Sequence, residues 1–160
     1  MSEASQRPQV VPQVIPVTSD GERFQALAIR EVVFIEEQHV PEGMERDDED
    51  AQAFHVLALQ GGHAIGTGRL SMLAHGPEGE PGRWGQIGRM AVLQGARGAG
   101  VGTLLLKALE EEARRREAEG ISLRAQLTAL EFYKKHGYQP VGPVFKEMGM
   151  DHLQMHKKFK

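Results

Sequence analysis

The segment "QGARGAGVGTLLLKALEEEARRRE", residues 94–117, places four glycines within eight residues and then continues directly as an amphipathic helix pattern. Glycine loses more backbone freedom on folding than any other residue, so Gly95, Gly98, Gly100 and Gly102 need a physical reason. The strand-like run "GQIGRMAVL" precedes the turn. A strand, a glycine-rich turn and a helix start together present unpaired backbone amides, so the segment predicts an anion-binding site.

Two familiar phosphate motifs do not fit this segment. Gly95 and Gly100 have the spacing of a P-loop, but Val101 stands where that motif requires lysine. A dinucleotide fingerprint needs G-x-G-x-x-G, whereas Gly98, Gly100 and Gly102 simply alternate. A flexible linker is disfavoured as well, because a linker needs neither the arginine within the turn nor the abrupt helix start after it. The turn therefore predicts an anion site of another type.

The remaining chain predicts one mixed α/β sheet. Strand and helix patterns follow the order β-α-β-β-β-α-β-α-β-β. Gly61 and Gly62 predict a hairpin turn, and Gly137 predicts a left-handed helix cap. Strands are expected near residues 10–17, 54–60, 63–72, 85–93, 121–127, 138–146 and 152–159, and helices near 21–34, 101–119 and 128–136.

Helical spacing also predicts which residues are buried. The first helix is expected to follow a cap at Asp20 and to bury Phe24, Leu27, Ala28 and Val32. The second is expected to end at Gly120 as a left-handed cap and to bury Val101, Leu104, Leu105, Ala108, Leu109 and Ala113. The acidic segment 41–50 is interpreted as a solvated loop.

Composition narrows the class of protein. The 160 residues fit one domain, expected at 10–160 after a flexible tail at 1–9. The net charge of 19 − 22 = −3 gives no electrostatic reason to expect nucleic acid as a partner. Without cysteine the chain has no disulfide and no thiol nucleophile, which fits a reducing cytoplasm. No apolar run is long enough to span a membrane, so no membrane association is expected.

The pattern Arg97-x-x-Gly100-x-Gly102 resembles the acyl-CoA pyrophosphate motif of the GNAT superfamily of N-acetyltransferases. The segment "AQLTALEFYKKHGY", residues 125–138, resembles that family's tyrosine-bearing helix and its Gly-aromatic ending. The segments "VVFIEEQHVP" and "FKEMGMDHLQM" are similar to small bacterial members of the ElaA type. The resemblance covers residues 10–159 and implies the single-domain GNAT fold, with a mixed sheet, flanking helices and a splayed central strand pair.

The resemblance implies acetyl-CoA as the acyl donor and assigns residues to it. The turn and helix start would bind the pyrophosphate through Arg97, Gly98, Ala99, Gly100, Val101, Gly102 and Thr103. The strand edge at Met90, Ala91 and Val92 would bond the pantetheine arm, and one of its amides would polarise the thioester carbonyl. Gln126 is expected to point toward the coenzyme. The chemistry requires no metal, and His152 and His156 lack a third ligand.

Tyr133 is the expected general acid, because aminolysis of a thioester releases a thiolate that a positioned phenol can protonate. A tyrosine pKa near ~10 would make that transfer roughly balanced. Ordinary aromatic packing beside Phe132 is the competing interpretation. The general base stays open among Glu37, Glu147 and His152. Glu37 also fits a solvated helix end, and His152 also fits a strand histidine satisfied by a neighbour.

These expectations describe an N-acetyltransferase that moves acetyl from acetyl-CoA to a primary amine by direct attack in a ternary complex. The alternative is a non-catalytic acyl-CoA-binding sensor or scaffold, which the presence of Tyr133 disfavours. A third interpretation rests on "REVVFIEEQ", which faintly resembles acyl-homoserine-lactone synthases. The acceptor stays open among sugars, polyamines, antibiotics, amino acids and protein N-termini. The acidic segment either attracts a cationic amine or keeps the protein soluble, and family members suggest a homodimer.

Overall fold

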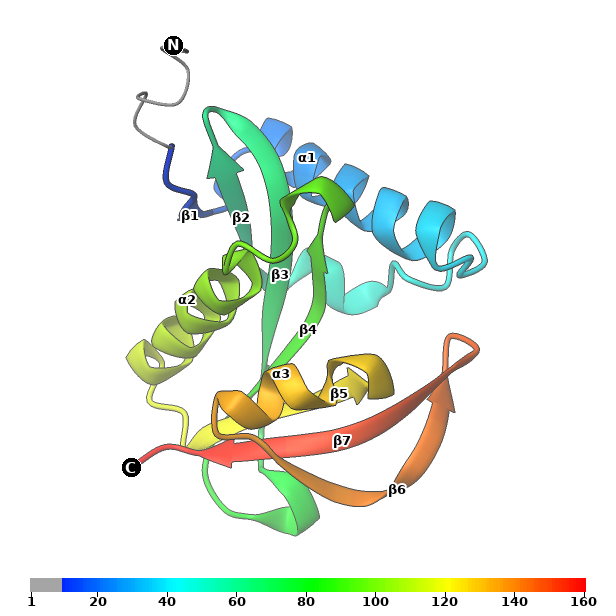
Figure 1. Ribbon diagram of the computed structural model, residues 1–160. Coiled ribbons are helices and arrows are strands. Elements are labelled where there is room, and N and C mark those ends of the chain that lie inside the picture. The colour runs from blue at the N-terminus through cyan, green and yellow to red at the C-terminus, as the bar shows by residue number, and fades with distance from the viewer. Residues whose placement is uncertain (1–9) are drawn as a thin grey trace, which may run out of the picture.

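The computed structural model describes residues 10–160, so the tail expected at 1–9 lies outside the described residues. A seven-stranded sheet with the strand order β1-β2-β3-β4-β5-β7-β6 forms the frame (Figure 1). The strands are β1 (Gln13–Pro16), β2 (Phe54–Gln60), β3 (His63–Leu73), β4 (Trp84–Val92), β5 (Gly120–Gln126), β6 (Gln139–Glu147) and β7 (Met150–Lys158). The α-helices are α1 (Asp20–Arg30), α2 (Val101–Arg115) and α3 (Leu130–Lys135), and a π-helical segment, Glu31–Glu37, continues α1. The predicted order of elements is confirmed.

The centre of the sheet is its one parallel pairing within the described chain, between β4 and β5. Only Gly85, Gln86 and Ile87 of β4 have partners on β5, in the register Gly85↔Ile121 to Ile87↔Leu123. Beyond Ile87 the two strands diverge, as Figure 1 shows. Every other pairing is antiparallel. The expected splayed strand pair is therefore present, and it leaves one edge of β4 without a strand partner.

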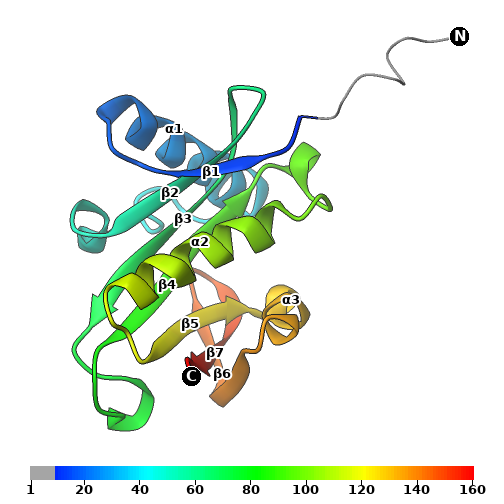
Figure 2. The ribbon, with the colours of Figure 1, turned by 90° about the vertical axis from the view of Figure 1, so that its left-hand side faces the viewer.

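Helix α2 covers one face of the sheet (Figure 2). Its buried apolar residues are Val101, Leu105, Leu106, Leu109 and Ala113, packed against Leu70, Ile87, Ile121 and Leu123. The predicted stripe was wrong at one position, because Leu104 is 38% exposed while Leu106 is fully buried. Glu110 is buried and accepts hydrogen bonds from the Tyr138 hydroxyl at 2.6 Å and from Lys157 at 3.2 Å. The acid is therefore part of the core between α2 and the β7 side of the sheet.

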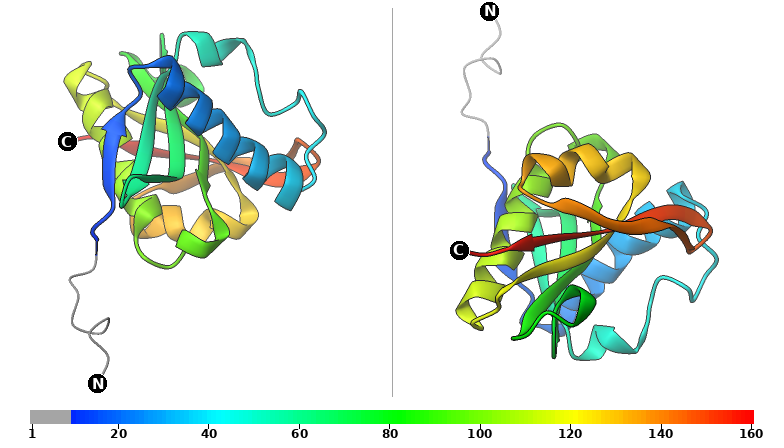
Figure 3. Two further views of the ribbon diagram at one scale, coloured as in Figure 1. Left: turned by 90° about the horizontal axis from the view of Figure 1, so that it is seen from above. Right: turned by 90° about the horizontal axis from the view of Figure 1, so that it is seen from below.

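Helix α1 lies on the opposite face (Figure 3). Ala26, Ile29 and Val33 pack here against Leu57 and Ala91. The predicted face was wrong, because Phe24 and Val32 are 74% and 40% exposed. The sequence carries two overlapping apolar stripes, and the sheet takes the one that includes Ile29.

The predicted hairpin turn and one of the predicted helix caps are present, and two other predicted caps were wrong. Gly61, Gly62 and Gly137 all have positive φ, as a tight hairpin and a left-handed cap require. The cap of α1 is Ser19, whose hydroxyl accepts from the Glu22 amide at 3.1 Å, rather than Asp20. Gly120 does not cap α2, which ends at Arg115. Gly120 starts β5, and a Cβ there would lie 2.7 Å from the buried ring of Trp84.

The acidic segment after α1 is solvated as predicted at most of its residues, but not at Glu45. Glu45 is fully buried and accepts from Arg30 Nε at 2.7 Å, and Arg30 is itself 1% exposed. Asp50 bonds both Arg30 and Arg69 at 2.7 Å. Burial opposes ionisation of Asp50, but the hydrogen bonds from these two arginines hold its pKa well below its usual range. The segment folds onto α1 and β3 because its acids find cations there.

Within residues 10–160, the structure contains no helix with the length and apolarity needed to cross a bilayer.

Candidate active site

The glycine-rich turn between β4 and α2 owes its course to two residues with left-handed backbone. Gly98 and Gly100 have φ of 84° and 82°, a region that L side chains rarely adopt. Gly100 is the N-cap of α2 and offers no side-chain acceptor to the first amides of the helix. A Cβ at Gly102 would approach Phe132 to 3.3 Å, so that glycine serves close packing against α3. The helix therefore begins with free amides on an exposed turn, as an anion site requires.

Two residues that the sequence placed in different roles meet beside this turn. Both terminal nitrogens of Arg97 donate hydrogen bonds to the carboxylate oxygens of Glu37, at 2.6 and 2.7 Å. The Arg97 hydrogen bond lowers the Glu37 pKa. Arg97 Nε also donates to the carbonyl of Val92 at 2.9 Å. The side chain expected to face the pyrophosphate thus spans from the end of β4 to the π-helical segment.

Other expected coenzyme residues have partners or positions of their own. The Thr103 hydroxyl lies 3.1 Å from His136 Nε2, and Val101 is buried in the core. Ala99 is exposed on the turn. The Gln126 amide nitrogen donates to the Gln38 side-chain oxygen at 3.0 Å. This bond joins the end of β5 to the segment that follows α1.

A β-bulge shapes the open edge of β4. Thr67 pairs with Ala91 and Arg69 with Gly88, so two residues of β4, Arg89 and Met90, lie opposite one residue of β3. Arg89 has a φ of 52°, which is rare for a side-chain-bearing residue. The bulge lies where β4 leaves β5, and it turns successive side chains into the space between the strands. Of the three residues expected to line the arm, Met90 borders this space, Ala91 packs toward α1 and Val92 is half-buried.

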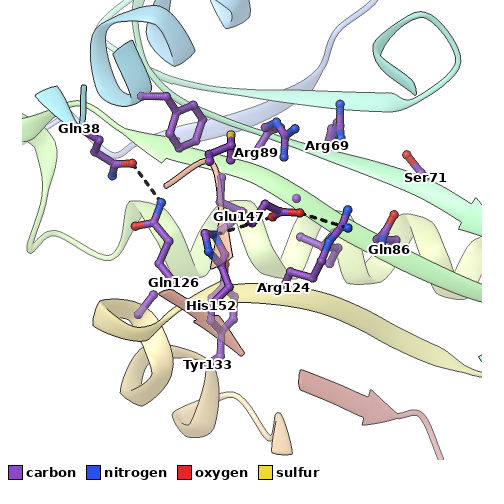
Figure 4. A pocket seen from close by; sticks show the side chains of 16 residues that line it. Gln38, Arg69, Ser71, Gln86, Arg89, Arg124, Gln126, Tyr133, Glu147 and His152 are labelled. Atoms are coloured by element: carbon purple, nitrogen blue, oxygen red, sulfur yellow. Dashed lines mark hydrogen bonds and ion pairs between the residues drawn. The ribbon is translucent and has the colours of Figure 1, made fainter. Parts of the chain in front are cut away.

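A cavity of about 120 Å³ occupies the space between the diverging strands (Figure 4). Tyr133, His152, Glu147 and Gln126 all line it, so the cavity brings together four residues that the sequence assigned to the site. Glu37 is not part of its lining. Burial raises the pKa of Tyr133 to about 12, well above the value near 10 expected from the sequence. The Tyr133 ring packs edge-to-face on Phe132 and Tyr138, which holds its orientation.

His152 and Glu147 form a polar pair on one wall. His152 Nδ1 lies 2.9 Å from the carbonyl of Met150, so that nitrogen donates a hydrogen bond to this oxygen. Its Nε2 lies 3.8 Å from a Glu147 carboxylate oxygen. The ring is 2% exposed and stacks on Phe145. An imidazole nitrogen and a carboxylate therefore line the cavity side by side.

Several lining residues were missed by the sequence analysis. They are polar, come from four segments of the chain, and comprise Gln38, Arg69, Ser71, Gln86, Arg89 and Arg124. Ser71 and Gln86 are directly opposed in the β3–β4 register. Strand alternation alone could have grouped Arg69 with Ser71, but the bulge that brings in Arg89 leaves no signal in composition or spacing.

Among residues 10–160, the structure contains no group of three or more histidine or acidic side chains arranged to hold a metal ion.

Comparison with known proteins identifies the family to which this chain belongs. Residues 17–159 match the family model described as an acetyltransferase (GNAT) domain. The uncharacterized N-acetyltransferase YjcF of Bacillus subtilis is 39% identical over 133 residues, 82% of this chain and 89% of the relative. ElaA of Escherichia coli is 30% identical over 139 residues, 86% of this chain and 88% of ElaA. The crystal structure of ElaA superposes with a TM-score of 0.76, over 92% of this chain and 100% of that one.

A further solved structure is similar over the same range. An acyl-CoA N-acyltransferase from Pseudomonas aeruginosa has a TM-score of 0.75 and 25% identity. The match covers 91% of this chain and 99% of that one. The resemblance drawn from the sequence motifs, including the ElaA type, is confirmed by these matches.

Proposed function

The chain belongs to the GNAT family of acyl-CoA-dependent acetyltransferases, and from that premise we propose that it transfers acetyl from acetyl-CoA to a primary amine. The observation that carries the proposal is the cavity between β4 and β5, where Tyr133, His152 and Glu147 face one space. The amine attacks the thioester carbon directly in a ternary complex. Free cysteine is absent, so no thiol-linked acyl-enzyme intervenes.

The residues present fit an acyl-CoA. The uncapped amides at the start of α2 and the left-handed glycines suit a diphosphate. The unpaired edge of β4 beyond Ile87 suits an amide-bearing arm, since free backbone groups there need hydrogen-bond partners. Arg97 would add positive charge after leaving Glu37. An amide near Met90 would polarise the thioester carbonyl.

Proton transfers fall to the cavity's own side chains. The acceptor ammonium loses a proton to His152 Nε2, beside Glu147, before its nitrogen forms the new C–N bond. The C–S bond breaks, and the sulfur takes the phenolic proton of Tyr133. The second proton, which the nitrogen releases as the amide forms, restores the phenol. A pKa of about 12 keeps this phenol protonated throughout the neutral range. Burial that raises the phenol's pKa disfavours a free thiolate in the same cavity for the same reason, which keeps the transfer feasible.

The test is Tyr133→Phe. Loss of the general acid should lower kcat by about 10²-fold or more, while KM for acetyl-CoA changes only a few-fold. CoA release from acetyl-CoA and a panel of primary amines is measured with a thiol reagent. The assay has no background from the protein, which contains no cysteine.

Tyr138→Phe is the matched control. Its ring lies 5.7 Å from that of Tyr133, but its hydroxyl donates to buried Glu110 instead of facing the cavity. This variant should lose stability, on the order of 1–3 kcal/mol, and keep its kcat. Unchanged turnover in Tyr133→Phe would reduce Tyr133 to packing. Tight acetyl-CoA binding without turnover on any amine would instead favour the sensor or scaffold.

A further inference from the structure

The wall of the cavity carries more positive than negative charge. Arg69, Arg89 and Arg124 line it, against the single carboxylate of Glu147 among the described lining residues. The acids paired with Arg69 and Arg89 are Asp47, Glu49 and Asp50, and none of them lines the cavity. The acidic segment therefore hydrogen-bonds these guanidinium groups, and both arginines also line the cavity.

Arg89 has donor capacity left over. Its Nε donates to the Glu45 carbonyl at 2.7 Å and its Nη2 to Asp47 at 3.2 Å, while Nη1 makes no hydrogen bond within residues 10–160. Arg89 is also incompletely compensated. Burial and the nearby charge of Arg69 lower its pKa, in that order of size. An anion beside Nη1 would relieve both effects.

Ser71 supplies a second unpaired donor. Its hydroxyl oxygen is enclosed, lines the cavity and has no hydrogen-bond partner in the described chain. Buried hydroxyls are normally hydrogen-bonded, so this hydroxyl is available to donate to a group bound in the cavity. Gln86 lies directly across the β3–β4 pairing and adds an amide. Arg124, 39% exposed and 3.2 Å from Glu147, borders the same region.

These donors are separated from the residues assigned to proton transfer. Figure 4 shows Ser71, Gln86 and Arg69 toward one end of the cavity and Tyr133, His152 and Gln126 toward the other. Gln86 pairs with Ser122, and Gln126 lies four residues farther along β5, which corresponds to roughly 13 Å at ~3.3 Å per residue. An acceptor that reaches both ends has its amine and its second polar group several bonds apart.

We infer that the acceptor is a small primary amine with an anionic carboxylate at its far end, bound by Arg89, Ser71, Gln86 and Arg124. This inference rests on the proposed function, since it names the acceptor class of the same cavity. It replaces the cationic-amine attraction considered for the acidic segment, because those acids are occupied by arginines. A polyamine would place a second ammonium against Arg89 and Arg124, which like-charge repulsion disfavours.

The experiment compares matched acceptors that differ only in the carboxylate. We expect 4-aminobutanoate and 6-aminohexanoate to be acetylated with at least tenfold higher kcat/KM than butylamine and hexylamine, respectively. The thiol assay described above provides the rates. A further assay uses 3-aminopropylphosphonate in place of 4-aminobutanoate. A higher kcat/KM for the phosphonate would retain the anion site but assign it to a phosphonate or phosphate group instead of a carboxylate.

Variants locate the anion within the cavity. Arg89→Gln should raise KM for 4-aminobutanoate ~10–100-fold, since it removes a charge-assisted hydrogen bond. Ser71→Ala should raise the same KM several-fold. In both variants the KM for butylamine, which lacks the carboxylate, should rise less than the KM for 4-aminobutanoate. Arg115→Gln, on the exposed surface of α2, is the control and should leave all constants unchanged.

Ser71→Ala keeps the test informative if Arg89→Gln folds poorly. Equal kcat/KM for amines with and without the carboxylate would overturn the inference and leave the proposed function standing. If no amine is acetylated, thermal shift with acetyl-CoA present tests the anion site separately from the proposed acetyl transfer. A rise in Tm from 4-aminobutanoate but not butylamine would retain the anion site and overturn the proposed function, whereas no rise from any anionic probe would overturn the inference.

Discussion

Two segments, 41–51 and 93–100, differ in how far the fold satisfies their polar groups. The first is acidic, and the carboxylates of Glu45, Asp47 and Asp50 are matched by Arg30, Arg69 and Arg89 within the fold. The second is rich in glycine and leads into α2 with amides that no side chain caps. Polar groups that are satisfied within the chain hold the fold, whereas those left free mark the place of a ligand. Variants in the two segments should therefore separate stability from ligand affinity.

The largest effect is expected in the buried network. Arg30→Met should lower the free energy of unfolding by about 3–5 kcal/mol, because it leaves Glu45 buried without its partner. Urea denaturation measures the loss, and acetyl-CoA affinity of the remaining folded protein should be unchanged. Arg46→Met is the control, since Arg46 is 52% exposed and 3.4 Å from Glu45. Equal losses in both variants would contradict the role assigned to burial.

The glycine turn should show the opposite response. Gly100→Ala forces a Cβ into left-handed backbone and should weaken acetyl-CoA binding ~10-fold, with destabilisation of roughly 1–2 kcal/mol. Calorimetry at a temperature well below Tm measures the affinity. Gly95→Ala is the matched control, because that glycine lacks positive φ and a Cβ there would meet no atom within 4 Å. An unchanged affinity in Gly100→Ala would break the contrast between the two segments.

Lowering the pH should weaken the network of acids and arginines and leave the glycine-rich turn unaffected. The hydrogen bonds of Arg69 lower the Asp47 pKa, and those of Arg30 and Arg69 overcome burial to lower that of Asp50. Depressed pKa values contribute stability above the unfolded value near ~3.9, which is lost as pH falls below it. The loss between pH 5 and pH 3 should be of order 1 kcal/mol per carboxyl after solvent screening. Thermal melts across this range should show a smaller pH dependence in Arg30→Met, and an equal dependence would contradict the assignment.

The smallest effect is expected at the ion pair between Glu37 and Arg97, beside the glycine-rich turn. Glu37→Gln frees Arg97 from an ion pair that is about one-third exposed on each side, so stability should change by less than ~1 kcal/mol. Affinity for acetyl-CoA should rise a few-fold, because Arg97 no longer has to leave a carboxylate. A large drop in kcat would instead assign Glu37 as the general base. Steady-state kinetics distinguish the two outcomes.

The sequence predicted elements well where local chemistry decides them. The hairpin at Gly61, the cap at Gly137 and the helix start at Val101 each depend on residues that are neighbours in the chain. Predictions failed where distant partners decide. Gly120 was assigned as a cap because it follows a helical pattern, but its packing against Trp84 determines its place.

The same division holds for the candidate site. Tyr133, His152 and Glu147 were identified through motifs, and the structure brings them to one cavity. Arg89 was missed because a bulge in β4 determines its position. The burial of Glu45 was missed because its partner, Arg30, lies fifteen residues earlier in the chain. Pairings of this kind depend on the closed fold and carry no local pattern.

The single tryptophan has a practical consequence. Trp84 is 1% exposed at the end of β4 that still pairs beside β5, away from the part where the strands separate. Its indole fluorescence should shift to longer wavelength when the sheet opens and stay nearly constant when the cavity fills. The fluorescence of Trp84 therefore reports global unfolding and does not respond to ligand binding in the cavity. The folding of each variant can be checked in the same cuvette that is used for its activity assay.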